Sequence, residues 1–151
     1  MSDIITVGWR ELVDMPVWGV RRLPAKLDTG ARTSALHVDQ LVGLPGGRVA
    51  FDVVLSRHRV DRRIRVETEV IRTARVRASS GVMTSRLIVR TRLRLGPFER
   101  EIEIGLVDRG PMIHRMLIGR SGLAGLAVSG DQRYLVSRPR RRRASTALEA
   151  P

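Results

Sequence analysis

Apolar and polar residues alternate with a period of two along much of this chain, a pattern that predicts β-strands. Isoleucine, valine or threonine occupies every second position of residues 64–70, with arginine and glutamate between them. A similar stretch, residues 87–95, leads into Gly96-Pro97, and another, residues 102–106, follows that turn. These two stretches predict a β-hairpin in which a row of arginines lies beside a row of glutamates.

Further short apolar stretches complete a β-rich prediction. We expect other strands at residues 4–7, 25–28, 49–55, 73–78 and 133–136. One short helix is expected after Gly119. Many short strands with little helix favour an all-β fold, and we predict a small closed β-barrel.

The composition is strongly basic. The chain has 28 Lys+Arg against 15 Asp+Glu, a formal net charge of +13, and Lys26 is its only lysine. Genome base composition explains an arginine excess as readily as function does, and we expect much of it to pair with glutamate. The absence of cysteine excludes disulfides and cysteine metal sites. Residues 1–16 lack the apolar run of a signal peptide and no stretch could span a membrane, so we expect a cytoplasmic protein without a membrane partner.

The end of the chain differs from the rest. Residues 1–137 have the length and apolar content of one domain, whereas residues 138–151 begin with arginines and contain little to bury. We expect this basic tail to be disordered. Two interpretations are open: a solubilising extension, or contact of Arg138 through Arg143 with an acidic surface such as ribosomal RNA.

Two short segments carry the candidate chemistry. In residues 26–31 an apolar strand delivers a carboxylate, Asp28, to a tight turn in which Gly30 permits close approach of the backbone. In residues 116–120 an apolar strand runs into Gly119-Arg120. An acid at the end of a strand is held by rigid backbone, which suits general acid and base chemistry.

Together the two segments resemble the active-site halves of a retropepsin. The resemblance narrows to small retropepsin-like aspartic peptidases of bacteria and archaea, whose members often carry the name ATP-dependent zinc protease. Some are encoded beside glutamate ligases of the ATP-grasp type. The resemblance runs from Thr6 to Val136 and is most specific at residues 28–37. Its other parts are Gly8-Trp9-Arg10-Glu11, Ser79-Ser80-Gly81, Leu95-Gly96, Ile102-Glu103, and Asp108-Arg109 with Met112.

The resemblance implies an aspartic endopeptidase with a retropepsin-type barrel and no metal or cofactor. Such enzymes activate water between two carboxyls that share one proton. Because the chain holds a single Asp-Thr-Gly, a homodimer is implied in which each subunit contributes Asp28. The implied roles are catalysis by Asp28, an active-site turn of Thr29, Gly30 and Ala31, substrate binding by Arg32, Thr33 and Ser34, and support from Gly119 and Arg120.

One position departs from the viral retropepsins. There an acidic residue follows Asp-Thr-Gly-Ala and pairs with the arginine of the Gly-Arg segment, whereas here Arg32 stands in its place. We therefore expect Arg120 to pair with Asp14 or Asp108, or to remain solvated. Arg32 is expected either to grip a carboxylate of an acidic, glutamate-rich substrate or to pair with an internal acid or the dimer partner.

Retropepsins also close a hairpin, the flap, over the substrate. By chain order the flap lies between Val54 and Ser85. Its tip is either Ser79-Ser80-Gly81 or the stretch of residues 57–63, and the sequence leaves both open.

Other mechanisms lack their motifs. ATP binding by a P-loop needs Gly-Lys-Ser or Gly-Lys-Thr, which the chain does not contain, and a metalloprotease site needs His-Glu-x-x-His. His37, His58 and His114 are scattered instead. The alternative to a peptidase is a basic β-barrel without catalytic activity that binds acidic protein or ribosomal RNA.

Overall fold

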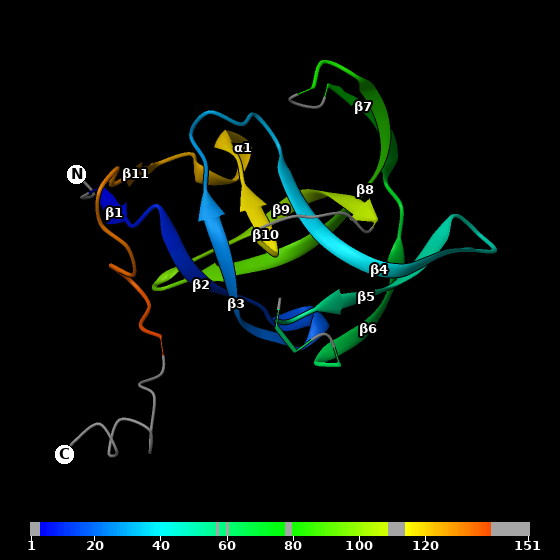
Figure 1. The fold of residues 1–151 in the computed structure, drawn as a ribbon, viewed down its shortest axis with the longest axis horizontal. Coiled ribbons are helices and arrows are strands. Elements are labelled where there is room, and N and C mark those ends of the chain that lie inside the picture. The colour runs from blue at the N-terminus through cyan, green and yellow to red at the C-terminus, as the bar shows by residue number, and fades with distance from the viewer. Residues whose placement is uncertain (1–3, 57, 60, 78–79, 109–113, 140–151) are drawn as a thin grey trace.

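Strands account for nearly all regular structure in the computed structural model, which describes residues 4–56, 58–59, 61–77, 80–108 and 114–139 (Figure 1). The elements are β1 (Ile5–Val7), β2 (Arg10–Met15), the 3-10 helix η1 (Pro16–Trp18), β3 (Val20–Leu27), β4 (Ser34–Leu44), β5 (Arg48–Val54), β6 (Arg63–Glu69), β7 (Arg72–Arg77), β8 (Met83–Leu95), β9 (Phe98–Asp108), β10 (Met116–Ile118), α1 (Arg120–Leu123) and β11 (Leu126–Val128). Within these ranges no helix has the length and apolar character needed to cross a membrane.

Strand β10 closes the main sheet into a ring. It pairs in parallel with β3, where Met116 lies opposite Ala25, and antiparallel with β4, where Met116 lies opposite Leu36. The strand order β10-β3-β2-β8-β9-β4 therefore returns to its start, while β5 and β6 extend the sheet beyond β4. The predicted all-β fold with a closed sheet and one short α-helix is confirmed.

Apolar side chains fill the inside of this ring. The largest fully buried ones include Phe51, Leu36, Leu93, Ile104 and Met116. Trp18 of η1 packs edge-on against Phe51, with ring centroids 5.6 Å apart. The alternation along the strands thus places one set of residues in the core and the other set outside.

The predicted hairpin and its two rows of charge are present on the outer face. Strands β8 and β9 pair antiparallel, with Arg90 opposite Glu103 and Arg94 opposite Glu99. A hydrogen bond from Arg92, joined by one from Arg94, lowers the pKa of Glu99. Glu103 is held in the same way by Arg72 and Arg90. Much of the charge on this hairpin is therefore neutralised locally.

The predicted strand at residues 133–136 is wrong. The side chain of Glu11, which is fully buried, takes the N–H groups that a strand would have paired. Its Oε2 accepts hydrogen bonds from the N–H of Gly8 at 2.7 Å, Leu135 at 2.8 Å and Val136 at 3.2 Å. The Ser137 hydroxyl donates to Oε1 at 2.6 Å. A buried carboxylate thus satisfies the backbone of this segment.

Several sequence predictions fall on residues outside the described part of the chain. They are the disorder of the tail at residues 140–151, the flap residue Ser79, and Arg109 and Met112 of the resemblance.

We predict that Glu11→Ala lowers the free energy of unfolding by about 3 kcal/mol, because three N–H groups and one hydroxyl lose a buried acceptor. Urea denaturation measures this change. The control Glu101→Ala removes a carboxylate that is 64% exposed and is expected to cost no more than about 0.5 kcal/mol. Equal losses in the two variants would contradict a special role for Glu11.

Candidate active site

Asp28 lies immediately after β3, where the chain turns toward β4. Its backbone N–H donates to the Ile118 carbonyl oxygen at 2.8 Å, and its carbonyl accepts from Ala31 at 3.2 Å. The carboxylate Oδ1 accepts the N–H of Gly30 at 2.9 Å. The side chain is 27% exposed. The turn therefore orients this carboxylate and leaves it accessible to water.

The segment after β10 holds the turn through its backbone. The N–H of Arg120 donates to the Ala31 carbonyl at 2.8 Å, and that of Ser121 donates to the Arg32 carbonyl at 3.0 Å. The Arg120 guanidinium donates to the Thr29 carbonyl at 3.0 Å. These bonds fix the backbone on both sides of Gly30, so the predicted supporting role of Gly119 and Arg120 agrees with their positions.

The carboxylate partners predicted for Arg120 are wrong. Asp14 instead accepts the backbone N–H of Arg22 at 2.8 Å and lies 4.0 Å from the Arg94 guanidinium. The contact of Arg120 is the carbonyl oxygen of Thr29. In the viral pattern an acidic side chain accepts from this arginine. Here Arg32 replaces that acid, and the Thr29 carbonyl is the acceptor instead.

Gly119 is required where two backbones meet. Its N–H donates to the Ser34 hydroxyl at 3.1 Å. A Cβ at this position would lie 2.4 Å from the Thr33 carbonyl oxygen and 2.8 Å from that of Ala31. The backbone at Gly119 is extended, with φ −90° and ψ −178°, so the glycine is needed for space rather than for conformation.

The residues predicted to bind substrate divide between surface and interior. Arg32 and Thr33 are exposed, whereas Ser34 is buried beneath Gly119. All three border a cavity of about 370 Å³ whose other walls include Glu101 and Glu103. Among the described residues, no carboxylate lies within ion-pairing distance of the Arg32 guanidinium. Arg32 is therefore available to a ligand or a second subunit.

One hairpin, formed by β7 and β8, lies in the part of the chain where the flap is expected. Strand β7 pairs only with the first half of β8, from Arg72 opposite Ile88 to Arg77 opposite Met83, and lies off the ring. It rises at the end of the molecule that carries the β3–β4 turn, whereas the loop between β5 and β6 lies at the opposite end (Figure 1). This arrangement favours a flap tip around Ser80-Gly81.

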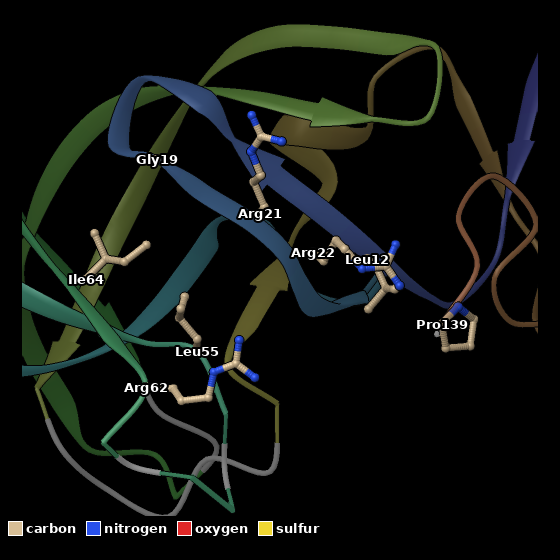
Figure 2. A pocket seen from close by; sticks show the side chains of 8 residues that line it. All are labelled: Leu12, Gly19, Arg21, Arg22, Leu55, Arg62, Ile64 and Pro139. Atoms are coloured by element: carbon tan, nitrogen blue, oxygen red, sulfur yellow. The ribbon is translucent and has the colours of Figure 1, made fainter. Parts of the chain in front are cut away.

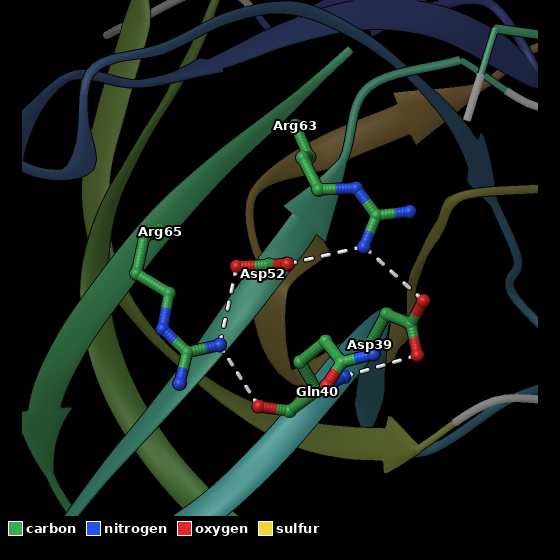
Figure 3. A network of polar contacts seen from close by, with 5 residues as sticks. All are labelled: Asp39, Gln40, Asp52, Arg63 and Arg65. Carbon is green, nitrogen blue, oxygen red and sulfur yellow. Dashed lines mark hydrogen bonds and ion pairs between the residues drawn. The ribbon is translucent and has the colours of Figure 1, made fainter. Parts of the chain in front are cut away.

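A second pair of carboxylates faces across strands β4 and β5 (Figure 3). Asp39 lies opposite Asp52, and Nη1 of Arg63 contacts both, at 3.2 and 3.0 Å. Arg65 contacts Asp52 at 3.2 Å and also donates to the Gln40 carbonyl. Two guanidinium groups bind this pair, which therefore has a structural role.

Lys26 also belongs to the site, although the resemblance to retropepsins assigned it no role. Its Nζ lies 3.9 Å from Oδ2 of Asp28. Residues two apart on a strand share a face. The position of Lys26, two residues before Asp28, would therefore have predicted that the two side chains lie together.

His37 of β4 is buried, and its backbone N–H donates to the Arg115 carbonyl oxygen at 2.9 Å. Burial, reinforced by the nearby charge of Arg115, lowers its pKa. Among the described residues, no group of three or more histidine, aspartate or glutamate side chains is arranged to hold a metal ion.

Comparison with known proteins places this geometry in a family. A family model described as "Retropepsin-like aspartic endopeptidase RimB" matches residues 6–139. A probable alpha-L-glutamate ligase of Parasynechococcus marenigrum is 33% identical over 128 residues, which are 83% of this chain and 28% of that protein. Another from Shewanella halifaxensis is 30% identical over 130 residues, 82% of this chain and 28% of that protein. The chain thus spans less than a third of the length of these relatives.

A solved structure shows the same fold. The crystal structure of a protein of unknown function from Legionella pneumophila matches 89% of this chain and 100% of its own, with a TM-score of 0.71 and 21% sequence identity.

We predict that Gly119→Ala destabilises the protein by about 3 kcal/mol, because the added Cβ collides with two carbonyl oxygens that cannot move without opening the turn. Thermal or urea unfolding measures the loss. The control Gly43→Ala adds a methyl group where nothing lies within 4 Å, and its effect should stay within about 0.5 kcal/mol. A tolerated Gly119→Ala would refute the close contact.

Proposed function

The chain belongs to the RimB-like family of retropepsin-like aspartic endopeptidases, and on that premise we propose that it hydrolyses peptide bonds with water activated between two copies of Asp28. The observation that carries the proposal is the carboxylate of Asp28, which is oriented by Gly30 and 27% exposed at the end of a rigid strand. The second carboxylate would be Asp28 of the partner subunit, related by a twofold axis.

The chemistry follows from two carboxyls that share one proton. The ionised carboxylate removes a proton from water while the protonated carboxyl donates to the carbonyl oxygen of the substrate. The water oxygen bonds to the carbonyl carbon. The resulting tetrahedral intermediate then loses the amine, which takes up the proton that the carboxylate removed from water. We expect activity from acidic to neutral pH.

Two observations support a dyad made between subunits. Thr29 and Gly30 are exposed on the turn and are free to meet the same turn of another copy. The other facing carboxylates, Asp39 and Asp52, are occupied by arginines. A site shared between subunits makes activity depend on protein concentration below the dissociation constant of the dimer.

Acidic, glutamate-rich peptides are the proposed substrates. Arg32 is exposed beside the turn and has no carboxylate partner within the described chain. A guanidinium can bind a carboxylate with two parallel hydrogen bonds. The name of the relatives, probable alpha-L-glutamate ligase, supports the choice of glutamate-containing peptides as the proposed substrates.

We predict that Asp28→Asn abolishes cleavage of a mixed peptide library that contains glutamate-rich members. Cleavage by the wild type is measured from acidic to neutral pH, with a metal chelator present, at several protein concentrations. The specific activity should fall on dilution as the dimer dissociates. Equal cleavage by both proteins would overturn the assignment of Asp28. Absence of cleavage by the wild type would favour a binding protein of the same fold.

We predict that Arg32→Glu lowers the preference for glutamate-containing over glutamine-containing peptides by about tenfold or more, because the charge that binds the substrate is reversed. The ratio of kcat/KM for matched peptides measures it. Arg48→Glu makes the same charge change at the exposed first residue of β5 and should leave the ratio unaltered. An unchanged ratio in Arg32→Glu would exclude binding of a substrate carboxylate by Arg32.

A further inference from the structure

A line of basic side chains leaves the candidate active site along the outer face of β3. Leu23, Ala25 and Leu27 are buried, whereas Pro24 and Lys26 alternate with them and face outward, as Asp28 does. Arg10 of β2 is the register partner of Lys26, so the two side chains share this face. Lys26 therefore lies between Arg10 and the candidate catalytic carboxylate, with its Nζ 3.9 Å from Oδ2 of Asp28.

The face continues into two cavities that share Leu55. The nearer one, about 290 Å³, is bordered by Arg10 and Pro24. The farther one, about 520 Å³, is bordered by Arg21, Arg22 and Arg62 around an apolar floor. Figure 2 shows Arg22 beside Leu12 at one side of the farther cavity and Arg62 beside Leu55 at another. No aspartate or glutamate of the described chain borders either cavity.

An irregularity in β3 directs two consecutive arginines to the same cavity. Neighbouring residues of a regular strand point to opposite faces. Here Arg22 has φ 56°, in the left-handed region, and the pairing of β2 with β3 shifts register between Val13 and Met15. Arg21 and Arg22 are consequently both exposed and both border the farther cavity. Bulges of this kind re-aim side chains, often near functional sites.

These cations differ in their partners from those of the β8–β9 hairpin. Arg90, Arg92 and Arg94 each lie within 4.0 Å of a glutamate. In the described part of the chain, the side chains of Arg10, Arg21, Arg22 and Arg62 make no ion pair with a carboxylate. Nε of Arg10 is a buried donor without a hydrogen-bond partner there. The positive charge along this face is therefore available to a ligand.

We infer that Lys26, Arg10, Arg21, Arg22 and Arg62 form a basic track that binds an extended polycarboxylate segment of the substrate on one side of the scissile bond. The inference rests on the proposed function. Six residues of strand separate Asp28 from Arg22, which corresponds to about 20 Å, the length of about six residues of extended peptide. A peptide occupant is favoured over single-stranded RNA because no phenylalanine, tyrosine or tryptophan borders either cavity to offer bases a stacking surface.

The test measures binding separately from cleavage. Fluorescein-labelled hexaglutamate is titrated with the Asp28→Asn protein, and anisotropy gives the Kd. Adding Arg21→Gln/Arg62→Gln should raise the Kd by about tenfold or more, because two charge-assisted contacts are lost. The control Arg48→Gln/Arg92→Gln removes the same charge from residues paired with Glu67 and Glu99 and should change the Kd no more than about twofold. Lys26→Met should weaken binding as the track variant does.

A second arm uses cleavage. The best library peptide is extended by six glutamates or six glutamines, and the track variant should raise KM for the glutamate form alone. Cleavage by the wild type with hexaglutamate binding unaffected by the track variant would overturn the track and leave the peptidase standing. Track-dependent binding without any cleavage would leave the track standing and remove the peptidase. Hexauridylate that binds more tightly than hexaglutamate, through the same arginines, would overturn the polycarboxylate assignment.

Discussion

The contact between Gly119 and the turn that follows β3 is the constraint on which the rest of the structure depends. A short strand, β10, pairs with β3 on one side and with β4 on the other, and so closes the sheet. The chain then passes so close to the carbonyls of Ala31 and Thr33 that only glycine fits. The same segment, β10 with Gly119, therefore both closes the ring and supports the Asp28 turn. A change that opened one would release the other.

The arginines of this protein serve two different purposes. Arg90, Arg92 and Arg94 of the β8–β9 hairpin face glutamates of the neighbouring strand, and both guanidinium groups of the cluster in Figure 3 contact Asp52. The exposed pairs of the hairpin contribute little to stability individually and chiefly neutralise the charge of a solvated face. The excess that gives the net charge of +13 must lie elsewhere, and part of it lies along β3 and the loop before β6. Composition alone could not separate the two groups.

The sequence predicted those parts of the fold that local patterns determine. The β8–β9 hairpin was predictable because its alternation and its Gly96-Pro97 turn are contiguous. A short apolar stretch misled at residues 133–136, where the acceptor, Glu11, lies about 125 positions earlier in the chain. Strand β2 was not predicted, because one of its buried positions holds this glutamate and so breaks the apolar pattern. The motifs found Asp28 and Gly119, but the carbonyl partner of Arg120 depends on the folded turn.

The choice of lysine beside Asp28 follows from the same chemistry. At 3.9 Å, Nζ of Lys26 is too far from Oδ2 for a hydrogen bond, whereas the Gly30 N–H binds Oδ1 at 2.9 Å. An arginine there could reach the carboxylate with two donors and hold it in a fixed pair, which would compete with water and with a second carboxyl. A compact ammonium group supplies positive charge without forming that two-donor pair. In a chain that uses arginine at every other strongly basic position, the single lysine stands where a guanidinium would interfere with the proposed chemistry of Asp28.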